Sequence, residues 1–236
     1  MVARGDLGLD VPLEEVPHVQ KEIIREARDA KVPVIVATQM LESMAMHLRP
    51  TRAEISDVCT AILDGTDAVM LSAETATGRY PVEAVRVMAQ TAERAERAIL
   101  ALEPASSQAN RVFGFPEAIS DAAAGAARRL QARAIVAFTQ SGFSARLISQ
   151  ARPNVPIIAL TPFVEVQRQL SLSWGVFSRT IPKVESTDDM LDEIDRTLLA
   201  DGTVSTGDVL VIISGTPMWV RGSTNLLKIH RVGERH

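Results

Sequence analysis

The feature that most constrains this chain is a series of short apolar runs rich in β-branched residues, each followed by a polar turn and a helical pattern. The clearest runs lie at residues 32–37 (VPVIVA), 67–72 (DAVMLS), 134–139 (AIVAFT), 155–160 (VPIIAL) and 209–214 (VLVIIS). Near-continuous apolar runs of this length are typical of parallel strands buried on both faces. Their alternation with helices predicts an α/β protein with parallel sheets.

Between these runs, apolar residues recur at the three- and four-residue spacing of helices. Thr51 and Glu54 form a T-x-x-E pattern, which predicts a capping box where one helix begins. Two further strands are predicted, a short one at 176–178 and a last one at 226–232. The predicted helices are residues 14–30, 52–63, 82–102, 118–130, 143–150, 164–172 and 190–200.

The β/α pattern is interrupted once. Residues 103–116 (EPASSQANRVFGFP) carry no periodicity, and the pattern restarts after them. This predicts a first domain at 1–103, a linker at 104–116 and a separate α/β domain with a mostly parallel sheet at 117–236.

Composition excludes several classes of function. The net charge of −4 gives no broad basic field, so neither nucleic acid nor a membrane surface is expected as a partner. No apolar run reaches the roughly 18 residues of a membrane span. The single cysteine, Cys59, excludes an internal disulfide framework and fits the reducing cytoplasm. His18 and His47 have no partner at zinc-ligand spacing, which argues against a zinc site.

The first candidate site is the segment Arg4, Gly5 and Asp6. Glycine lets the backbone approach a ligand closely, and an aspartate oxygen is a hard ligand that suits Mg²⁺. From these three residues alone, a loop with a solvated aspartate is the favoured interpretation.

Polar residues follow two of the predicted strands directly. Thr38 comes after the run at 32–37, and Ser72 and Glu74 come after the run at 67–72. The carboxyl ends of barrel strands are where such folds place their chemistry. The alternative is structural, because these residue types also cap helices and turns.

A glycine-containing turn at 139–144 lies between a predicted strand and a predicted helix. Hydroxyls and backbone N–H groups at a helix N-terminus can bind an anion. The turn is too short for a P-loop and lacks its lysine, so it predicts a site for one phosphate or, alternatively, only a capped turn. The candidate residues are Thr139, Ser141, Gly142, Phe143 and Ser144.

These motifs are weak singly, but their order and spacing resemble a known family. The segments at 2–8 (VARGDLG), 34–44 (VIVATQMLESM), 49–58 (RPTRAEISDV) and 64–85 (DGTDAVMLSAETATGRYPVEAV) resemble the second half of the pyruvate kinase catalytic barrel. The segments at 139–153 and 214–232 are similar to the effector loop and the closing loop and strand of that family's C-terminal domain.

The resemblance implies an incomplete (β/α)8 TIM barrel, about its last three β/α units, followed by the regulatory domain. It implies phosphoryl transfer from phosphoenolpyruvate to ADP, giving pyruvate and ATP, with Mg²⁺ (or Mn²⁺) and K⁺. A homotetramer and a sugar-phosphate effector are further expectations.

By the same resemblance, Asp6 would bind the metal, and the backbone of Gly5 and Asp6 would hold the substrate. Thr38 would contact the substrate carboxylate near the carbon that gains a proton. Ser72 and Glu74 would line the same mouth. Arg52, with residues 39–49, would lie at a subunit interface.

The resemblance also predicts what this chain lacks. The family's catalytic lysine, a second metal-binding glutamate and the K⁺ ligands are expected on the part that would precede Met1. The chain alone is therefore expected to be inactive. In the effector loop, Phe143 stands where some members carry a basic residue. Two rivals remain: a non-catalytic oligomerisation and sugar-phosphate-binding module, and another phosphate-handling barrel enzyme.

Overall fold

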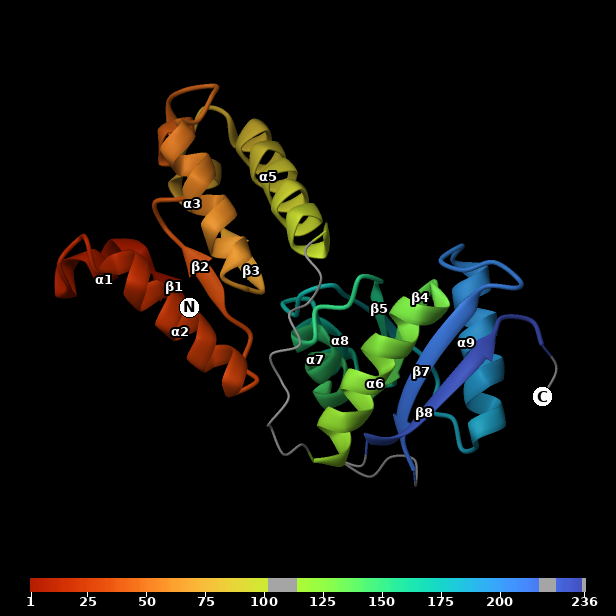
Figure 1. Ribbon diagram of the computed structural model, residues 1–236. Helices are drawn as coiled ribbons and strands as arrows, with labels where there is room; N and C mark the ends of the chain where they lie inside the picture. The colour runs from red at the N-terminus through yellow and green to blue at the C-terminus, as the bar shows by residue number, and fades with distance from the viewer. Residues whose placement is uncertain (102–113, 217–223, 235–236) are drawn as a thin grey trace. The chain divides into compact units, whose positions relative to one another are not determined.

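The computed structural model describes residues 1–101, 114–216 and 224–234, and the chain divides into two compact units (Figure 1). Unit 1 is Met1–Ser107 and unit 2 is Gln108–His236. Most of the predicted linker at 104–116 lies outside the described residues, as does the greater part of the predicted closing loop.

Unit 1 contains a three-stranded parallel sheet in the order β1-β2-β3. Helices follow each of the three strands. The elements, in chain order, are β1 (Val2–Ala3), α1 (Arg4–Asp10), α2 (Val16–Asp29), β2 (Ile35–Ala37), the 3₁₀ helix η1 (Glu42–Ala45), α3 (Arg52–Leu63), β3 (Ala68–Met70), α4 (Ala73–Ala76) and α5 (Pro81–Ala101).

The core of unit 1 lies between one face of this sheet and the helices. Val2, Val36 and Val69 stand side by side in register on that face, and all three belong to or pack against the core. The helices α3 and α5 lie side by side in Figure 1 and supply buried residues such as Val58 and Met88. Burying this apolar face holds the short strands in place.

Unit 2 contains a five-stranded sheet in the order β6-β5-β4-β7-β8. Its first four strands are parallel, and β8 runs antiparallel to β7. The elements are α6 (Phe115–Leu130), β4 (Ala134–Phe138), α7 (Phe143–Gln150), β5 (Ile157–Thr161), α8 (Val164–Leu170), β6 (Val176–Thr180), α9 (Thr187–Ala200), β7 (Val209–Gly215) and β8 (Thr224–Arg231).

Both faces of this second sheet are covered. Ile135 and Ala137 of β4 pack with α6 and α7 on one face, whereas Val136 and Phe138 pack with α9 on the other. All five residues of β4 and of β5 are buried. This burial explains the continuous apolar runs in the sequence, because a strand covered on both faces has no solvent-facing side.

The predicted α/β class with mostly parallel sheets is confirmed, and the predicted helices and strands form with shifted ends. The capping box at Thr51 and Glu54 is present. Three local features differ. The loop interpretation of 4–6 is wrong, because Arg4–Asp10 is helical. The helix expected from 190 starts at Thr187, because Ser186 and Asp189 form a second capping box. Residues 42–45 add a 3₁₀ turn.

Within the ranges the structure describes, there is no helix long and apolar enough to cross a membrane.

Candidate functional site

The polar residues predicted in unit 1 gather at one edge of its sheet. Thr38 follows β2, Ser72 follows β3, and α1 begins directly after β1. The three strands are parallel, so these positions share the carboxyl edge. This is the edge at which α/β barrels carry their ligand-binding groups.

Thr38 adopts an unusual backbone conformation. Its φ is 65°, and that of Gln39 is 53°. A left-handed conformation is a genuine outlier for a β-branched residue and persists only where its surroundings enforce it. The Thr38 hydroxyl donates to the Ala37 carbonyl at 2.6 Å and accepts from the Gly5 backbone N–H at 2.8 Å.

The Thr38 hydroxyl therefore caps a helix, but not the one that follows it in sequence. Gly5 is the second residue of α1, whose preceding residue Ala3 makes no side-chain cap. The first N–H groups of a helix have no partner inside the helix. Thr38 satisfies one of them from the neighbouring strand, and so it joins the ends of β1 and β2.

Arg4 is almost fully buried and donates hydrogen bonds to the Thr38–Gln39 turn. Its Nε donates to the Thr38 carbonyl at 3.2 Å, and its Nη2 donates to the Gln39 carbonyl. Its Nη1 pairs with Asp57 Oδ2 of α3 at 3.1 Å. Sequence reasoning missed this role, although an arginine that cannot be solvated needs several acceptors.

Glu74 is a buried carboxylate, 3% exposed, at the same edge. It accepts from the Ser72 backbone N–H at 2.8 Å and from the Leu41 backbone N–H at 3.0 Å. It thereby ties the turn after β3 to the turn after β2. Ser72 precedes α4, but its hydroxyl forms no capping bond.

Asp6 lies in the first turn of α1 with its side chain exposed. The described part of the chain has no group of three or more His, Cys, Asp or Glu side chains that could hold a metal ion. The carboxylate of Glu74 accepts from two backbone N–H groups, one at each oxygen. Because Mg²⁺ needs about six oxygen ligands, the residues present supply one ligand and not a complete site.

Glu54 fastens the segment between β2 and α3. It accepts from the backbone and hydroxyl of Ser43 at 2.7 and 2.6 Å, and from the backbone and hydroxyl of Thr51 at 2.7 and 2.9 Å. Burial raises the pKa of Glu54, but these hydrogen bonds outweigh it, so the pKa lies below the ordinary glutamate value. Arg52, the predicted interface residue, is exposed at the first position of α3.

The turn at 139–144 lies at a topological switch point of unit 2. The chain leaves β4 toward β5 on one side, and β7 pairs with β4 on the other. Open α/β sheets bind ligands outside the carboxyl ends of the strands at such points. Thr139 Oγ1 accepts from the Gly142 N–H at 2.9 Å, which closes the turn.

Gly142 permits this turn and a close approach to Arg146. Its φ is +80°, and a Cβ there would lie 2.6 Å from Arg146 Nη1. Arg146 is half-buried, and burial lowers its pKa. Its guanidinium has neither a hydrogen-bond nor an ion-pair partner in the described residues. Sequence reasoning missed Arg146, which stands one helical turn after Gly142.

The predicted phosphate-site residues differ in whether their side chains are free to contact a ligand. Ser144 is buried, and its hydroxyl shares a hydrogen bond of 2.5 Å with Thr224 at the start of β8. Thr139 is also buried and already paired. Ser141 and Phe143 are half-exposed. The side chains left to meet a ligand are therefore those of Ser141 and Arg146.

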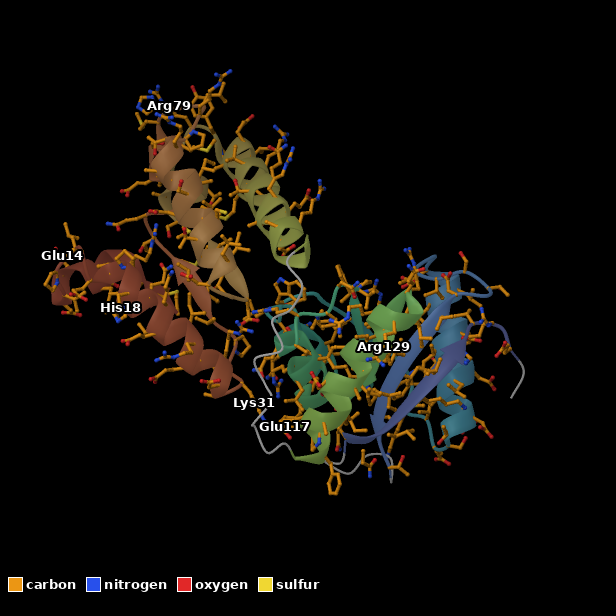
Figure 2. The ribbon with its side chains drawn as sticks, viewed as in Figure 1. Glu14, His18, Lys31, Arg79, Glu117 and Arg129 are labelled. Atoms are coloured by element: carbon orange, nitrogen blue, oxygen red, sulfur yellow. The ribbon has the colours of Figure 1, made fainter. Side chains whose placement is uncertain are left out.

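Two histidines take part in pairs away from both sites. His18 projects from α2 (Figure 2), and its Nε2 lies 3.4 Å from Glu22 Oε1. His230 of β8 is buried, and its Nε2 lies 2.7 Å from Asp195 Oδ1 of α9. The second pair joins the edge strand to the helix that covers it.

Two family models match this chain. The model for the pyruvate kinase barrel domain matches residues 1–85, and the model for the pyruvate kinase alpha/beta domain matches residues 117–230.

Similar proteins extend over nearly the whole chain. A pyruvate kinase of Mycobacterium tuberculosis is 48% identical over 238 residues, covering 99% of this chain and 49% of that protein. A pyruvate kinase of Geobacillus stearothermophilus is 47% identical, covering 99% of this chain and 40% of that protein. A crystal structure of a pyruvate kinase from Cryptosporidium parvum superposes with a TM-score of 0.85 at 37% identity, covering 98% of this chain and 46% of that one. The chain therefore spans about half the length of these relatives.

Proposed function

This chain belongs to the pyruvate kinase family, and we propose that it supplies part of an enzyme that transfers a phosphoryl group from phosphoenolpyruvate to ADP. The observation that carries this proposal is the strained turn at Thr38, tied to the N-terminus of α1 at the carboxyl edge of the sheet. Backbone strain that its surroundings enforce is concentrated at functional sites.

Within that reaction we assign roles to four groups. The backbone of Gly5 and Asp6, at the start of α1, holds the anionic substrate, because the positive end of the helix dipole favours negative charge. Thr38 contacts the substrate carboxylate near the carbon that gains a proton. Ser72 and Glu74 line the same substrate site. Glu74 does so by hydrogen-bonding the turns after β2 and β3.

The proposed enzyme uses Mg²⁺ or Mn²⁺ together with K⁺. Asp6 offers one oxygen ligand to the divalent ion, and the remaining ligands, including those for K⁺, come from outside the described residues. A divalent ion at such a site offsets the charge that builds up during phosphoryl transfer. We further propose a cytoplasmic homotetramer in which Arg52 and the segment 39–49 lie at a subunit interface.

Alone, this chain is proposed to be inactive, because its edge of the sheet supplies one metal ligand where a complete site needs several. A coupled assay with lactate dehydrogenase, which oxidises NADH as pyruvate forms, tests this directly. We expect no turnover above the protein-free rate. Turnover by this chain alone would overturn the proposal.

The family activity is tested in a fusion in which the unmatched portion of the Mycobacterium tuberculosis relative precedes Met1. We expect pyruvate formation, and Thr38→Ala should lower kcat by about 10²- to 10⁴-fold, the range for a group that assists proton transfer. Thr60→Ala, a substitution in α3 away from the edge, is the matched control. Equal rates for the two variants would remove Thr38 from the mechanism.

A second candidate function is a non-catalytic module that binds a sugar phosphate through residues 139–144. It is favoured by the switch-point position of the turn and by the guanidinium of Arg146, which has no hydrogen-bond or ion-pair partner among the described residues. Isothermal titration with fructose 1,6-bisphosphate, other sugar phosphates and AMP tests it. We expect heat that is reduced in Ser141→Ala and in Arg146→Gln. No heat with any of these ligands would refute this function.

A further inference from the structure

The strained turn after β2 is connected to α3 through the side chain of Arg4. Arg4 donates to the carbonyls of both left-handed residues, Thr38 and Gln39, and its Nη1 donates to Asp57 Oδ2 at 3.1 Å. Each of its three side-chain nitrogens therefore donates to an oxygen of unit 1, and the residue is only 8% exposed. An arginine at the mouth of an anion site is usually assigned to the anion, but this guanidinium is already engaged with the protein.

The turn depends on these donors because its backbone is strained. A non-glycine residue keeps a left-handed conformation only where its surroundings enforce it. Without Arg4, the carbonyls of Thr38 and Gln39 would lose their donor, and the turn would relax toward an ordinary φ. The Thr38 hydroxyl would then leave the position in which it accepts from the Gly5 N–H at 2.8 Å.

Asp57 fixes the direction in which Arg4 meets the turn. A guanidinium is a rigid planar fork, so pairing Nη1 with a carboxylate also sets where Nε and Nη2 point. A hydrogen bond between two charged groups is roughly twice as strong as a neutral one. The side chain of Asp57 is 52% exposed, so its charge can be removed without opening the core of unit 1.

We infer that Arg4 and Asp57 are positioning residues, which hold the Thr38 hydroxyl where it acts on the substrate. Neither residue contacts the substrate in this assignment. The inference rests on the role proposed for Thr38 above. The alternative is a purely structural link between α1 and α3, whose loss would lower stability and leave the turnover of the folded enzyme unchanged.

The Gly5 amide reports the position of Thr38 without any need for activity. As an N–H of the first helical turn it has no acceptor within α1, and it donates to Thr38 Oγ1 instead. In the full 236-residue chain, Asp57→Asn should speed hydrogen exchange of this amide at least about tenfold and leave the amides of α2 unchanged. Arg4→Lys, which keeps the charge and loses the fork, should speed it as well.

Glu22→Gln is the matched control for Asp57→Asn. Glu22 is also a helical carboxylate in an ion pair, and its side chain is 50% exposed against 52% for Asp57. It should leave the exchange of the Gly5 amide unchanged. An equal effect of both substitutions would overturn the inference.

The catalytic arm uses the fusion with the Mycobacterium tuberculosis portion, with circular dichroism to show that parent and variant are folded. Asp57→Asn should lower kcat at least about tenfold and change the KM for ADP by less than about twofold, because Thr38 is assigned to the other substrate. Glu22→Gln should change neither constant.

Faster Gly5 exchange together with a lower kcat supports the inference. Unchanged Gly5 exchange in both Asp57→Asn and Arg4→Lys overturns it. Faster exchange with the kcat of the parent also overturns it, because the link would then be structural only. A parent fusion that forms no pyruvate refutes the proposed activity instead, and the exchange of Gly5 then decides alone whether the two residues position Thr38.

Discussion

Arg4 gathers acceptors from two different parts of the chain around one buried guanidinium. The two carbonyls belong to a turn that the backbone does not favour, and the carboxylate of Asp57 belongs to α3. The planar fork of arginine can meet all three acceptors, whereas a lysine ammonium is a compact point donor. Arg4 thus links the turn after β2 to α3.

We expect Arg4→Lys to destabilise unit 1 by about 1–3 kcal/mol, because at least one buried carbonyl loses its donor. Hydrogen exchange of the α3 amides measures this loss. Arg25→Lys, at an exposed position of α2, is the control and should change stability by less than about 0.5 kcal/mol. Matching values for the two variants would contradict the role assigned to Arg4.

Gly142 offers a second test at the scale of one residue. We expect Gly142→Ala to lower the stability of unit 2 by more than about 2 kcal/mol, because it adds a left-handed alanine whose Cβ would lie 3.1 Å from Cδ2 of the fully buried Leu170, while the flexible Arg146 guanidinium can move aside. Gly175→Ala is the matched control, with φ +67° and nothing within 4 Å of the new Cβ. It should cost only the conformational part, about 1–2 kcal/mol. Urea unfolding of both variants separates the two contributions, and equal costs would exclude the clash.

The hydrogen bonds of Arg4 and the close approach of Arg146 to Gly142 could not be predicted from the sequence. Thr38 was recognised as a site residue by its position after a strand, but its left-handed φ was not, because β-branched residues rarely adopt it. Arg4 bonds to residues that are distant in the sequence, and Arg146 is placed by packing against Gly142. Periodicity reports which face of an element is buried and does not report which acceptors a buried cation meets.

At the scale of elements, the segment from β2 to α3 is held by one carboxylate. The depressed pKa of Glu54 means that the folded state favours the ionised form. Its stabilising contribution is therefore complete above the ordinary glutamate pKa and is lost as the pH falls through the lower, folded value.

We expect Glu54→Gln to destabilise α3 by about 1 kcal/mol at pH 7. The difference between the variant and the parent should shrink as the pH falls below the ordinary glutamate pKa and through the lower pKa of the folded state, where the parent loses its charge. Hydrogen exchange of α3 amides across this range measures it. Glu83→Gln, at the first turn of α5, serves as the control. A difference that does not depend on pH would contradict the assignment.

The elements themselves were largely predictable, because each apolar run became a strand and each amphipathic pattern a helix. The exceptions have physical causes. Gly5 and Gly8 are poor helix formers, so α1 depends on tertiary support such as the bond from Gly5 to Thr38. The antiparallel direction of β8 relative to β7 is not encoded in the pattern of apolar residues.

At the scale of the whole molecule, the two units differ in how completely their sheets are covered. In unit 2, β4 and β5 are buried throughout, whereas in unit 1 the three residues of β3 are half-buried or exposed. Hydrophobic stabilisation scales with the apolar area removed from water. Unit 1 should therefore be the less stable of the two when the chain is studied by itself.

We expect urea to unfold the chain in two steps, with unit 1 first. Trp174 and Trp219 both fall in the sequence of unit 2, so tryptophan fluorescence should report only the later step, and far-ultraviolet circular dichroism should report both. Val58→Ala, in the core of unit 1, should lower only the first midpoint. Ile194→Ala, in the core of unit 2, should cost about 2–5 kcal/mol and lower only the second. If both probes instead follow one coincident transition that either variant shifts, the two units unfold as one cooperative body and the open sheet of unit 1 does not limit its stability.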